Sequence, residues 1–311
     1  MPDLLQIGGI TDDMRARLAE RFTIHQMGGD YPAEAITHIV TNGHDGVPAA
    51  VLEACQNAKV AASYGVGYDA IDTDTCSARG ILVTHTPDVL NEEVATTAIM
   101  LMLTTYRNFL SDEAHARSGA WERDGNAPLS RSADGRAVGI LGLGRIGQAI
   151  ADKLKAFNAD IHYHTRTERD VPYTYHASLV DMARAVDVII CITPGGPATK
   201  HLVNADVMNA LGPDGKLINV SRGSVVDEAA MVRALLDGRL GYAALDVFEE
   251  EPRIPAALKS MSNVVLLPHV GSATHETRAA MGNLVVDNLL SHLDTGRVVT
   301  PVPECAHLNT G

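Results

Sequence analysis

Short apolar runs alternate with longer mixed segments through the first part of the chain. The runs occupy residues 4–8, 22–26, 38–42, 59–65 and 81–85. Runs of this length predict buried strands, and each gap between them is long enough for a crossover helix. In the first gap, Thr11 is a suitable N-cap for such a helix. The pattern predicts a doubly wound domain of five parallel strands.

Beyond this domain, residues 91–107 carry apolar side chains on several faces of a predicted helix, which is typical of a helix that is almost wholly buried. A polar stretch rich in Ser, Gly and Arg follows at 117–136. A second series of apolar runs then occupies residues 137–141, 161–165, 186–192, 216–220, 243–248 and 263–268. Six strands with intervening helices match the doubled mononucleotide-binding architecture.

The chain is therefore expected to form two α/β domains, each a doubly wound parallel sheet. A flavodoxin-like substrate domain comprises residues 1–98 plus 285–311, and a Rossmann dinucleotide-binding domain comprises residues 99–284. A final long helix at 275–294 carries the chain back. The segment after that helix is too short to be a domain, and we expect it to pack on the first domain.

Composition supports two globular domains and narrows the possible partners. The 311 residues exceed what a single core usually holds, and a net charge of −13 leaves no basic footprint for nucleic acid. The longest weakly polar stretch, 95–106, is too short to span a membrane, and the first residues lack the basic segment of a signal peptide. We expect a cytoplasmic protein with no nucleic-acid or membrane partner.

The cysteines carry little functional signal. Cys55, Cys76, Cys191 and Cys305 lie far apart, and none belongs to a CxxC pair. This spacing suggests neither a zinc site nor a disulfide framework. We expect four buried thiols in a reducing compartment and no bound metal.

A GxGxxG pattern lies between the run 137–141 and a helical segment. In a dinucleotide site Gly142 would form the tight turn, Gly144 would admit the pyrophosphate, and Gly147 would allow close helix packing. Amide groups at the helix start would hold phosphate. The predicted cofactor turn comprises Gly142, Leu143, Gly144, Arg145, Ile146 and Gly147. The alternative is a glycine-rich turn without a ligand.

The end of the next strand predicts which cofactor is used. An NAD site would place an acidic residue there, about 20 residues after the glycines, to bind the ribose hydroxyls. Thr165, Arg166 and Thr167 occupy this stretch instead, which favours the 2′-phosphate of NADP and predicts that NADPH is preferred over NADH. The alternative is that Arg166 faces solvent and Glu168 or Asp170 binds the ribose.

Three polar residues follow consecutive strands of the second series: Arg222, Glu251 and His269. The carboxyl ends of parallel strands form the edge where ligands bind. A Glu beside a His at such an edge is a pairing that general acid–base catalysis uses. Each residue alone could be an ordinary loop residue, but their occurrence at consecutive strand ends favours a shared crevice.

These segments together resemble the D-isomer-specific 2-hydroxyacid dehydrogenases. The resemblance rests on SYGVGYDAID (63–72), GLGRIG (142–147), NVSRGSVVDE (219–228), ALDVFEEEP (244–252) and LPHVGSAT (267–274). It spans almost the whole chain, and the motifs occur in the family's order. The resemblance implies the two-domain fold and NAD(P)-dependent reduction of a 2-keto acid to the D-2-hydroxy acid.

The resemblance also implies roles at the matching positions. Arg222 corresponds to the residue that binds the substrate's carboxylate and carbonyl oxygen. His269 corresponds to the acid/base that protonates this oxygen, and Glu251 to its partner. The backbone amides of Val66 and Gly67 correspond to the family's cradle for the substrate carboxylate, which would place the site between the domains.

Further cofactor contacts are implied at other strand ends and on the helix after residue 91. Many members carry an acidic residue where this chain has Thr96, so only Thr97 is carried over from that helix. The other implied cofactor residues are Cys191, Ile192, Thr193, Pro194, Val220, Ser221, Asp246, Gly271 and Ser272.

Within the family, the NADP-type residues and the short two-domain chain resemble the glyoxylate/hydroxypyruvate reductase group, so we expect a small 2-keto acid as substrate. Aryl-pyruvate reduction is the alternative. Tyr64 and Trp121 could shape a specificity pocket, or each could simply be a packed aromatic. An alternative of another class is a dinucleotide-sensing, corepressor-like binding protein. The family also implies a homodimer built on the cofactor domains.

Overall fold

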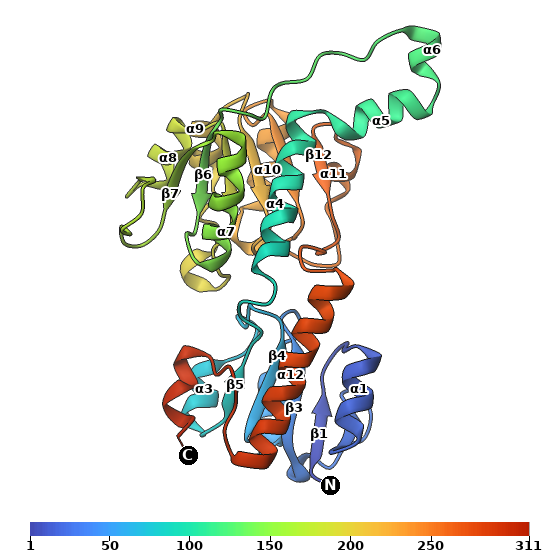
Figure 1. The fold of residues 1–311 in the computed structure, drawn as a ribbon, viewed down its shortest axis with the longest axis vertical. Helices are drawn as coiled ribbons and strands as arrows, with labels where there is room; N and C mark the ends of the chain where they lie inside the picture. The colour runs from blue at the N-terminus through green and yellow to red at the C-terminus, as the bar shows by residue number, and fades with distance from the viewer. Residues whose placement is uncertain (311) are drawn as a thin grey trace. The chain divides into compact units, whose positions relative to one another are not determined.

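The computed structural model describes residues 1–310 and divides the chain into two compact units (Figure 1). One unit comprises Met1–Leu90 and the chain from Ser272 onward, and the other comprises Asn91–Gly271. The boundaries expected from the sequence, 98/99 and 284/285, fall inside the helices α4 (Asn91–Tyr106) and α12 (His275–Thr295). The structure assigns each helix to one unit because a continuous helix packs as a single element.

The first unit contains a five-stranded parallel sheet in the order β2-β1-β3-β4-β5. Its strands are β1 (Asp3–Gln6), β2 (Thr23–Gln26), β3 (Ile36–Asn42), β4 (Val60–Tyr64) and β5 (Leu82–Thr84). This is the flavodoxin-like order, so the expected fold class of the unit is confirmed. Its helical segments are η1 (Ala33–Ala35), α1 (Asp12–Ala19), α2 (Ala49–Ala54), α3 (Thr73–Ala78), α12 and η5 (Pro303–Leu308).

Two hydrogen bonds hold the first helix and the C-terminal segment in place in the first unit. Thr11 caps α1 by accepting a hydrogen bond from the Met14 amide at 3.2 Å. The amide of Val302 donates to the carbonyl of Val83 at 2.9 Å, and Val302 is buried. The segment after α12 therefore packs beside β5, as the sequence predicted.

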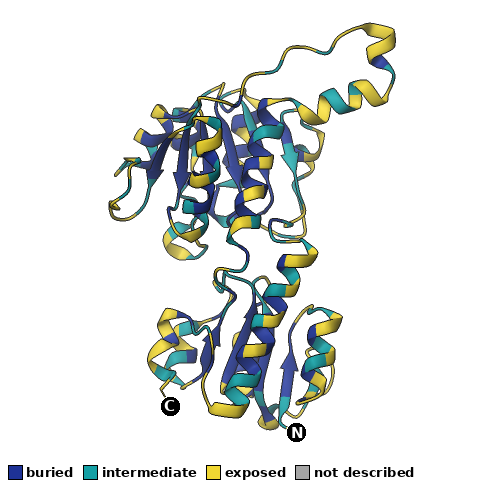
Figure 2. Ribbon diagram, viewed as in Figure 1, coloured by how far each residue is buried: buried dark blue, intermediate teal, exposed yellow. Residues whose placement is uncertain are grey.

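The second unit contains a seven-stranded parallel sheet in the order β12-β11-β10-β9-β6-β7-β8. Its strands are β6 (Ala137–Leu141), β7 (Asp160–His164), β8 (Thr174–Tyr175), β9 (Val188–Cys191), β10 (Lys216–Asn219), β11 (Tyr242–Leu245) and β12 (Val264–Leu266). The order is that of a Rossmann sheet with one further strand. Figure 2 shows the strands of both sheets largely buried and the outer faces of the helices exposed.

Strand β8 was missed by the sequence pattern, which predicted six strands. It consists of two residues at the sheet edge, Thr174 exposed and Tyr175 half-buried. Such a strand has no apolar run to detect. The helical segments of this unit are α4, α5 (Phe109–Arg117), α6 (Ala120–Asp124), α7 (Arg145–Leu154), η2 (Lys155–Phe157), α8 (Leu179–Ala185), η3 (Pro197–Thr199), α9 (Ala205–Leu211), η4 (Gly223–Val225), α10 (Glu228–Leu236) and α11 (Ala256–Ser260).

Helices α5 and α6 form an arm that departs from the end of α4. Figure 1 shows this arm extending away from the sheet of its own unit. Its side chains Phe109, Leu110 and Trp121 are 58%, 53% and 63% exposed. The polar stretch that the sequence showed at 117–136 thus contains a helix, α6. Helix α4 is less buried than expected, since the side chain of Met100 is 46% exposed.

No helix in the described part of the chain is long and apolar enough to cross a membrane. The four cysteine side chains are all buried, as expected.

Candidate active site

The glycine turn after β6 has the geometry that a dinucleotide requires. Gly142 has φ +100°, in the left-handed region, and a Cβ there would lie 2.9 Å from the backbone of Thr193. A Cβ at Gly147 would lie 2.2 Å from the carbonyl oxygen of Gly142. A Cβ at Gly144, the N-cap of α7, would meet no atom within 4 Å. The first and third glycines therefore serve packing, and the second leaves open space in front of the helix N-terminus.

A pocket of about 610 Å³ opens at this turn. It is lined by Leu143, Gly144, Arg145, Gln148, Arg169, Asp170 and Val171. Its two arginines outnumber its single carboxylate, that of Asp170, and together with the N-terminus of α7 they give the pocket a positive potential, which suits phosphate groups. The residues present therefore fit a phosphorylated dinucleotide.

The predicted NADP residues Thr165, Arg166 and Thr167 follow β7 directly, in the loop that leads to this pocket. Arg166 and Thr167 are exposed. The loop is braced from beneath by the buried Tyr163, whose hydroxyl donates to the Arg169 carbonyl at 3.0 Å and accepts from the Arg169 amide at 2.9 Å. Arg169 lines the pocket although the predicted cofactor residues do not include it. Its place in the same loop as Arg166 is the sequence feature that could have identified it.

Other predicted cofactor residues lie at the same edge of the sheet. Cys191 ends β9 and is fully buried, and burial raises the pKa of its thiol to about 12. Its side chain is therefore a neutral core group. Ile192, Thr193 and Pro194 continue beyond the strand, while Val220 and Ser221 continue beyond β10. Because β6, β9 and β10 are parallel neighbours, these segments share one edge.

Asn219, the last residue of β10, shapes the turn that carries Arg222. Its side-chain oxygen accepts from the Ser221 amide at 3.1 Å and from the Ser221 hydroxyl at 2.8 Å. Its side-chain nitrogen donates to the carbonyl of Arg222 at 2.9 Å. The Arg222 guanidinium in turn donates from Nη1 to the Ser221 carbonyl at 2.8 Å. Asn219 is buried and was not named from the sequence.

The turn at Arg222 packs directly on the loop that carries Glu251. A Cβ at Gly223 would lie 1.9 Å from the carbonyl carbon of Phe248. Only glycine allows this approach, so the two predicted catalytic segments are held against each other.

His269 and Glu251 form the predicted pair. Nδ1 of His269 lies 2.7 Å from Oε2 of Glu251, and the other oxygen, Oε1, accepts from the Phe248 amide at 3.0 Å. Because a carboxylate only accepts, Nδ1 carries the proton of this bond and Nε2 is the atom left for chemistry. The Glu251 side chain is 16% exposed and that of His269 is 43% exposed. The carboxylate is thus fixed and sheltered, whereas the imidazole is open to a ligand.

Asp246 supports the loop on which His269 stands. Its two oxygens accept from the amides of Val270 and Gly271, each at 2.7 Å, and its carbonyl accepts from the His269 amide at 2.8 Å. Burial raises the pKa of its carboxyl, against these hydrogen bonds and the nearby imidazole. The sequence named Asp246 for a cofactor contact; the structure shows that its carboxylate holds the His269 loop.

The remaining predicted residues divide between the two units. Thr97, on α4, is buried and donates through its hydroxyl to the carbonyl of Gly271 at 3.2 Å. Val66 and Gly67 lie in the first unit, in the loop after β4, where the ring of His85 donates from Nδ1 to the Val66 carbonyl at 3.0 Å. Ser272 also lies in the first unit and is half-buried.

The two aromatic candidates have different surroundings. Tyr64 is buried, its hydroxyl donates to the Arg278 carbonyl at 3.0 Å, and the Arg278 guanidinium lies over its ring. It is therefore a packed aromatic. Trp121 is exposed on the arm, where its indole nitrogen donates to Asn126 at 3.1 Å.

Comparisons with known proteins agree with this geometry. Residues 99–271 match the family described as D-isomer specific 2-hydroxyacid dehydrogenase, NAD binding domain. The chain is 46% identical to a glyoxylate/hydroxypyruvate reductase A of Arabidopsis thaliana, over 86% of each chain. It is 44% identical to a hydroxyphenylpyruvate reductase of Plectranthus scutellarioides, over 87% of this chain and 86% of that one.

Among solved structures, the NADPH-dependent glyoxylate/hydroxypyruvate reductase of Sinorhizobium meliloti, in complex with NADP and malonate, superposes with a TM-score of 0.94. The two chains are 48% identical, and the match covers 98% of each.

Proposed function

The chain belongs to the D-isomer-specific 2-hydroxyacid dehydrogenases, and from this premise we propose that it reduces glyoxylate or hydroxypyruvate to the D-2-hydroxy acid with NADPH. Membership makes it an NAD(P)-dependent 2-keto acid reductase. The observation that carries the proposal is the 2.7 Å contact between His269 and Glu251 beside a braced Arg222 turn. A complete acid–base pair of this kind predicts turnover rather than binding alone.

Arg222 orients the substrate in this proposal. Its planar guanidinium can donate two parallel hydrogen bonds to a carboxylate or to a carboxylate and the adjacent keto oxygen. Asn219 fixes the turn below it, so little freedom is lost when substrate binds. In the first unit, the amides of Val66 and Gly67 bind the substrate carboxylate, as the family resemblance implies.

His269 supplies the proton. When bound, the nicotinamide cofactor supplies the hydride that reduces the keto carbon. The protonated ring of His269 donates from Nε2 to the keto oxygen as negative charge develops there. Glu251 holds Nδ1–H and stabilises the imidazolium, because an opposite charge at 2.7 Å favours the charged form.

The preference for NADPH rests on the loop after β7. Thr165, Arg166 and Thr167, with Arg169 nearby, offer hydroxyls and cations to the 2′-phosphate. The Sinorhizobium relative, which is NADPH-dependent, binds NADP in its structure. The alternative keeps Arg166 in solvent and assigns the ribose to Glu168 or Asp170.

A panel of 2-keto acids assayed with NADPH and NADH tests substrate and cofactor together. We expect kcat/KM to be highest with glyoxylate or hydroxypyruvate, and NADPH to be used in preference to NADH. Arg166→Gln should raise KM for NADPH and leave KM for NADH nearly unchanged. Arg184→Gln, which removes an exposed arginine paired with Asp181 on α8, is the matched control. A clear NADH preference in the unaltered enzyme would contradict the cofactor assignment.

Two other functions remain distinguishable by the same panel. Similarity to the hydroxyphenylpyruvate reductase makes aryl-pyruvate reduction the second candidate, and higher kcat/KM with phenylpyruvate than with glyoxylate would favour it. A dinucleotide-sensing binding protein would oxidise NADPH with none of the keto acids.

We also propose that the enzyme is a homodimer. The arm formed by α5 and α6 exposes the large apolar side chains of Phe109, Leu110 and Trp121, which association with a second copy would cover. Light scattering should give twice the chain mass, and Leu110→Asp should give a monomer. Leu236→Asp, at an exposed leucine on α10, is the control. A monomeric wild-type protein would refute the proposal.

We propose that the enzyme is cytoplasmic. Its four buried cysteines are free thiols, which suits a reducing compartment. Fractionation of cells with an antibody to the chain is the test, and recovery in a secreted fraction would contradict it.

A further inference from the structure

A second pocket lies at the amino ends of the strands of the Rossmann sheet, whereas the catalytic residues follow the carboxyl ends. It has a volume of about 360 Å³, near the lower end of the roughly 300–1,000 Å³ typical of small-molecule sites. Lys216 and Tyr242 line it from the first residues of β10 and β11. Arg222 follows the far end of β10, so the pocket and the proposed active site lie at opposite ends of the same strand.

Lys216 has an unusual environment for a lysine. It is 3% exposed, and its Nζ lies 3.7 Å from the ring centre of Tyr242 and 4.6 Å from that of Tyr106. Buried lysines are nearly always paired with a carboxylate. Within residues 1–310, no carboxylate lies within ion-pair distance of this ammonium group, and its contacts are the two aromatic faces. Its charge is therefore only partly compensated.

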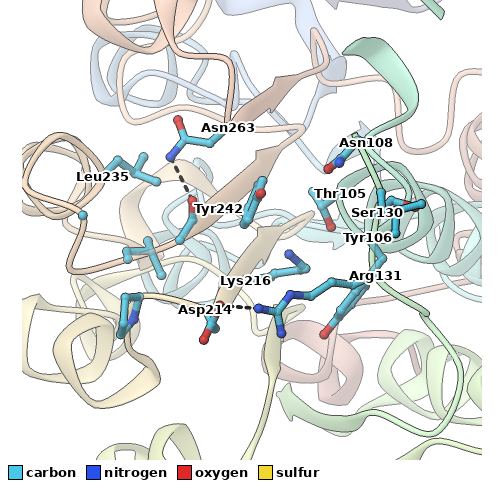
Figure 3. Close-up of a pocket in the computed structure, with 15 residues that line it drawn as sticks. Thr105, Tyr106, Asn108, Ser130, Arg131, Asp214, Lys216, Leu235, Tyr242 and Asn263 are labelled. Atoms are coloured by element: carbon cyan, nitrogen blue, oxygen red, sulfur yellow. Dashed lines mark hydrogen bonds and ion pairs between the residues drawn. The ribbon is translucent and has the colours of Figure 1, made fainter. Parts of the chain in front are cut away.

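The surrounding charges leave an excess of positive potential. Arg131 also lines the pocket and forms an ion pair with Asp214 at 3.1 Å. Arg136 also lies over the Tyr106 ring, with its guanidinium carbon 5.1 Å from the ring centre. Asp187 accepts a hydrogen bond from the Ala137 amide at 3.0 Å. Figure 3 shows Lys216 and Arg131 close together on one side of the pocket, next to Asp214.

The pKa of Lys216 agrees with this excess of positive charge. Burial, followed by the positive charges of Arg131 and Arg136, lowers the pKa of Lys216 to about 8. Asp214 and Asp187 act in the opposite direction but do not restore the ordinary value. The negative charge of an anion in the pocket would act against this lowering, because an opposite charge nearby favours the protonated amine.

Apart from the charged groups, the lining combines the polar side chains of Thr105, Asn108, Ser130 and Asn263 with an apolar part. Leu129, Leu235 and Leu240 line the pocket together with Pro213. A small inorganic ion would leave these side chains without a contact, whereas an organic anion would cover them.

We propose that this pocket is a second ligand site that binds a small organic anion, with its carboxylate between Lys216 and Arg131 and its aromatic or branched aliphatic body against the leucines. The ligand is recognised by one negative charge and an apolar body that fits the pocket. The site is separate from the substrate site and does not depend on the function proposed above.

Isothermal titration with benzoate as the probe tests the site. We expect the wild-type enzyme to bind benzoate, and Lys216→Met to weaken that binding at least tenfold while retaining the length of the side chain. Lys259→Met, at an exposed lysine on α11, should bind as the wild type does. Arg222→Ala should also retain binding, which separates this pocket from a carboxylate site at the catalytic arginine. Equal binding by Lys216→Met, or no binding by the wild type, overturns the proposal.

Two further measurements protect the test against a misfolded variant. Arg131→Gln should weaken benzoate binding independently of Lys216. Crystals soaked in 4-bromobenzoate should show anomalous bromine density among Leu129, Leu235 and Leu240; bromine density only at the Arg222 turn overturns the proposal.

Binding should also depend on pH. The affinity of the wild-type enzyme should fall about tenfold between pH 7 and pH 9, because the fraction of protonated Lys216 falls by that factor around a pKa of about 8. The other charged or titratable groups that face Lys216 are Arg131, Arg136, Asp214, Asp187, Tyr242 and Tyr106, and burial raises the pKa of Tyr106 to about 12. In Lys216→Met this dependence should disappear, and a pH dependence that persists there would overturn the assignment.

Discussion

His269 combines an unfavourable backbone with an exposed ring. Its φ of +55° lies in the left-handed region, which costs a non-glycine residue roughly 1–2 kcal/mol. The Asp246 carbonyl and carboxylate hold residues 269–271 in place, and Glu251 holds the ring. Strain that the surroundings maintain at a polar, exposed residue is typical of a functional position.

Removal of the imidazole should abolish proton transfer. We expect His269→Ala to lower kcat for keto acid reduction by roughly 10²–10⁴-fold, the usual contribution of a general acid. Binding of NADPH should be nearly unchanged. His275→Ala, at an exposed histidine that begins α12, serves as the control in steady-state assays. Near-normal turnover by His269→Ala would exclude it as the proton donor.

Glu251→Gln removes the negative charge beside His269 while keeping a hydrogen-bond acceptor for its Nδ1. The amide can still accept the hydrogen bond from Nδ1, but it no longer stabilises an imidazolium. We expect kcat for keto acid reduction to fall in Glu251→Gln while KM for the keto acid stays nearly unchanged, as steady-state assays would measure. An unchanged kcat would show that Glu251 only orients the ring.

At the residue scale, the sequence predicted Arg222, Glu251 and His269 because each lies within three residues of the end of an apolar run. Asn219 and the loop-holding role of Asp246 were not predictable. Their side chains bond backbone groups of a neighbouring turn or strand end, and those partners become known only when the strands are placed in the sheet.

At the scale of elements, the turn between β6 and α7 assigns different tasks to its glycines. Gly147→Ala should force α7 away from the turn, because the new Cβ would lie 2.2 Å from the Gly142 carbonyl oxygen. We expect a loss of roughly 1–3 kcal/mol in stability. Gly144→Ala meets no atom within 4 Å and has φ −85°, so its thermal midpoint should be that of the wild type.

The affinity of Gly144→Ala for NADPH tests whether the cofactor uses the open space at this glycine. Gly144→Ala should weaken NADPH binding in a fluorescence titration, because the methyl group occupies the space that the pyrophosphate requires. A variant that is stable and binds NADPH normally would show that the open space at Gly144 is not used by the cofactor.

The long buried strands were predictable because their apolar runs are continuous, and the edge strand and the arm were not. Thr174 and Tyr175 form β8 only by pairing with β7. Helix α5 contains no buried residue in the described chain, so it lacks the apolar stripe by which a helix is predicted. Contacts outside the chain itself, such as those of the proposed dimer, would supply the missing stabilisation.

At the scale of the whole molecule, the fold class followed from the sequence and the unit boundaries did not. Alternation of strands and helices specifies doubly wound sheets wherever it occurs. The assignment of α4 and α12 depends on which sheet each helix packs against. That choice is made by side chains distributed over both series of strands, and neither helix contains a glycine or proline break at residue 98 or 284.

A contact between the buried His38 and His292 makes the stability of the first unit sensitive to acid. His38 on β3 is 3% exposed, and its Nε2 lies 3.0 Å from Nδ1 of His292 on α12. Burial, followed by the charges of His292 and Lys59, lowers the pKa of His38 from 6.5 to about 3. Above pH 6.5 both the folded and the unfolded chain hold this ring neutral, so it has no effect on stability.

Below pH 6.5 the unfolded chain binds a proton that the folded chain excludes, so stability falls as the pH decreases towards 3. From pH 6.5 to 5 this single group should cost about 2 kcal/mol, at 1.36 kcal/mol per pH unit. Urea unfolding followed by circular dichroism at pH 7 and pH 5 measures the loss. His38→Leu should remove most of it, whereas His307→Leu, at an exposed histidine near the C-terminus, should not. An equal loss in His38→Leu and wild type would assign the acid sensitivity to other groups.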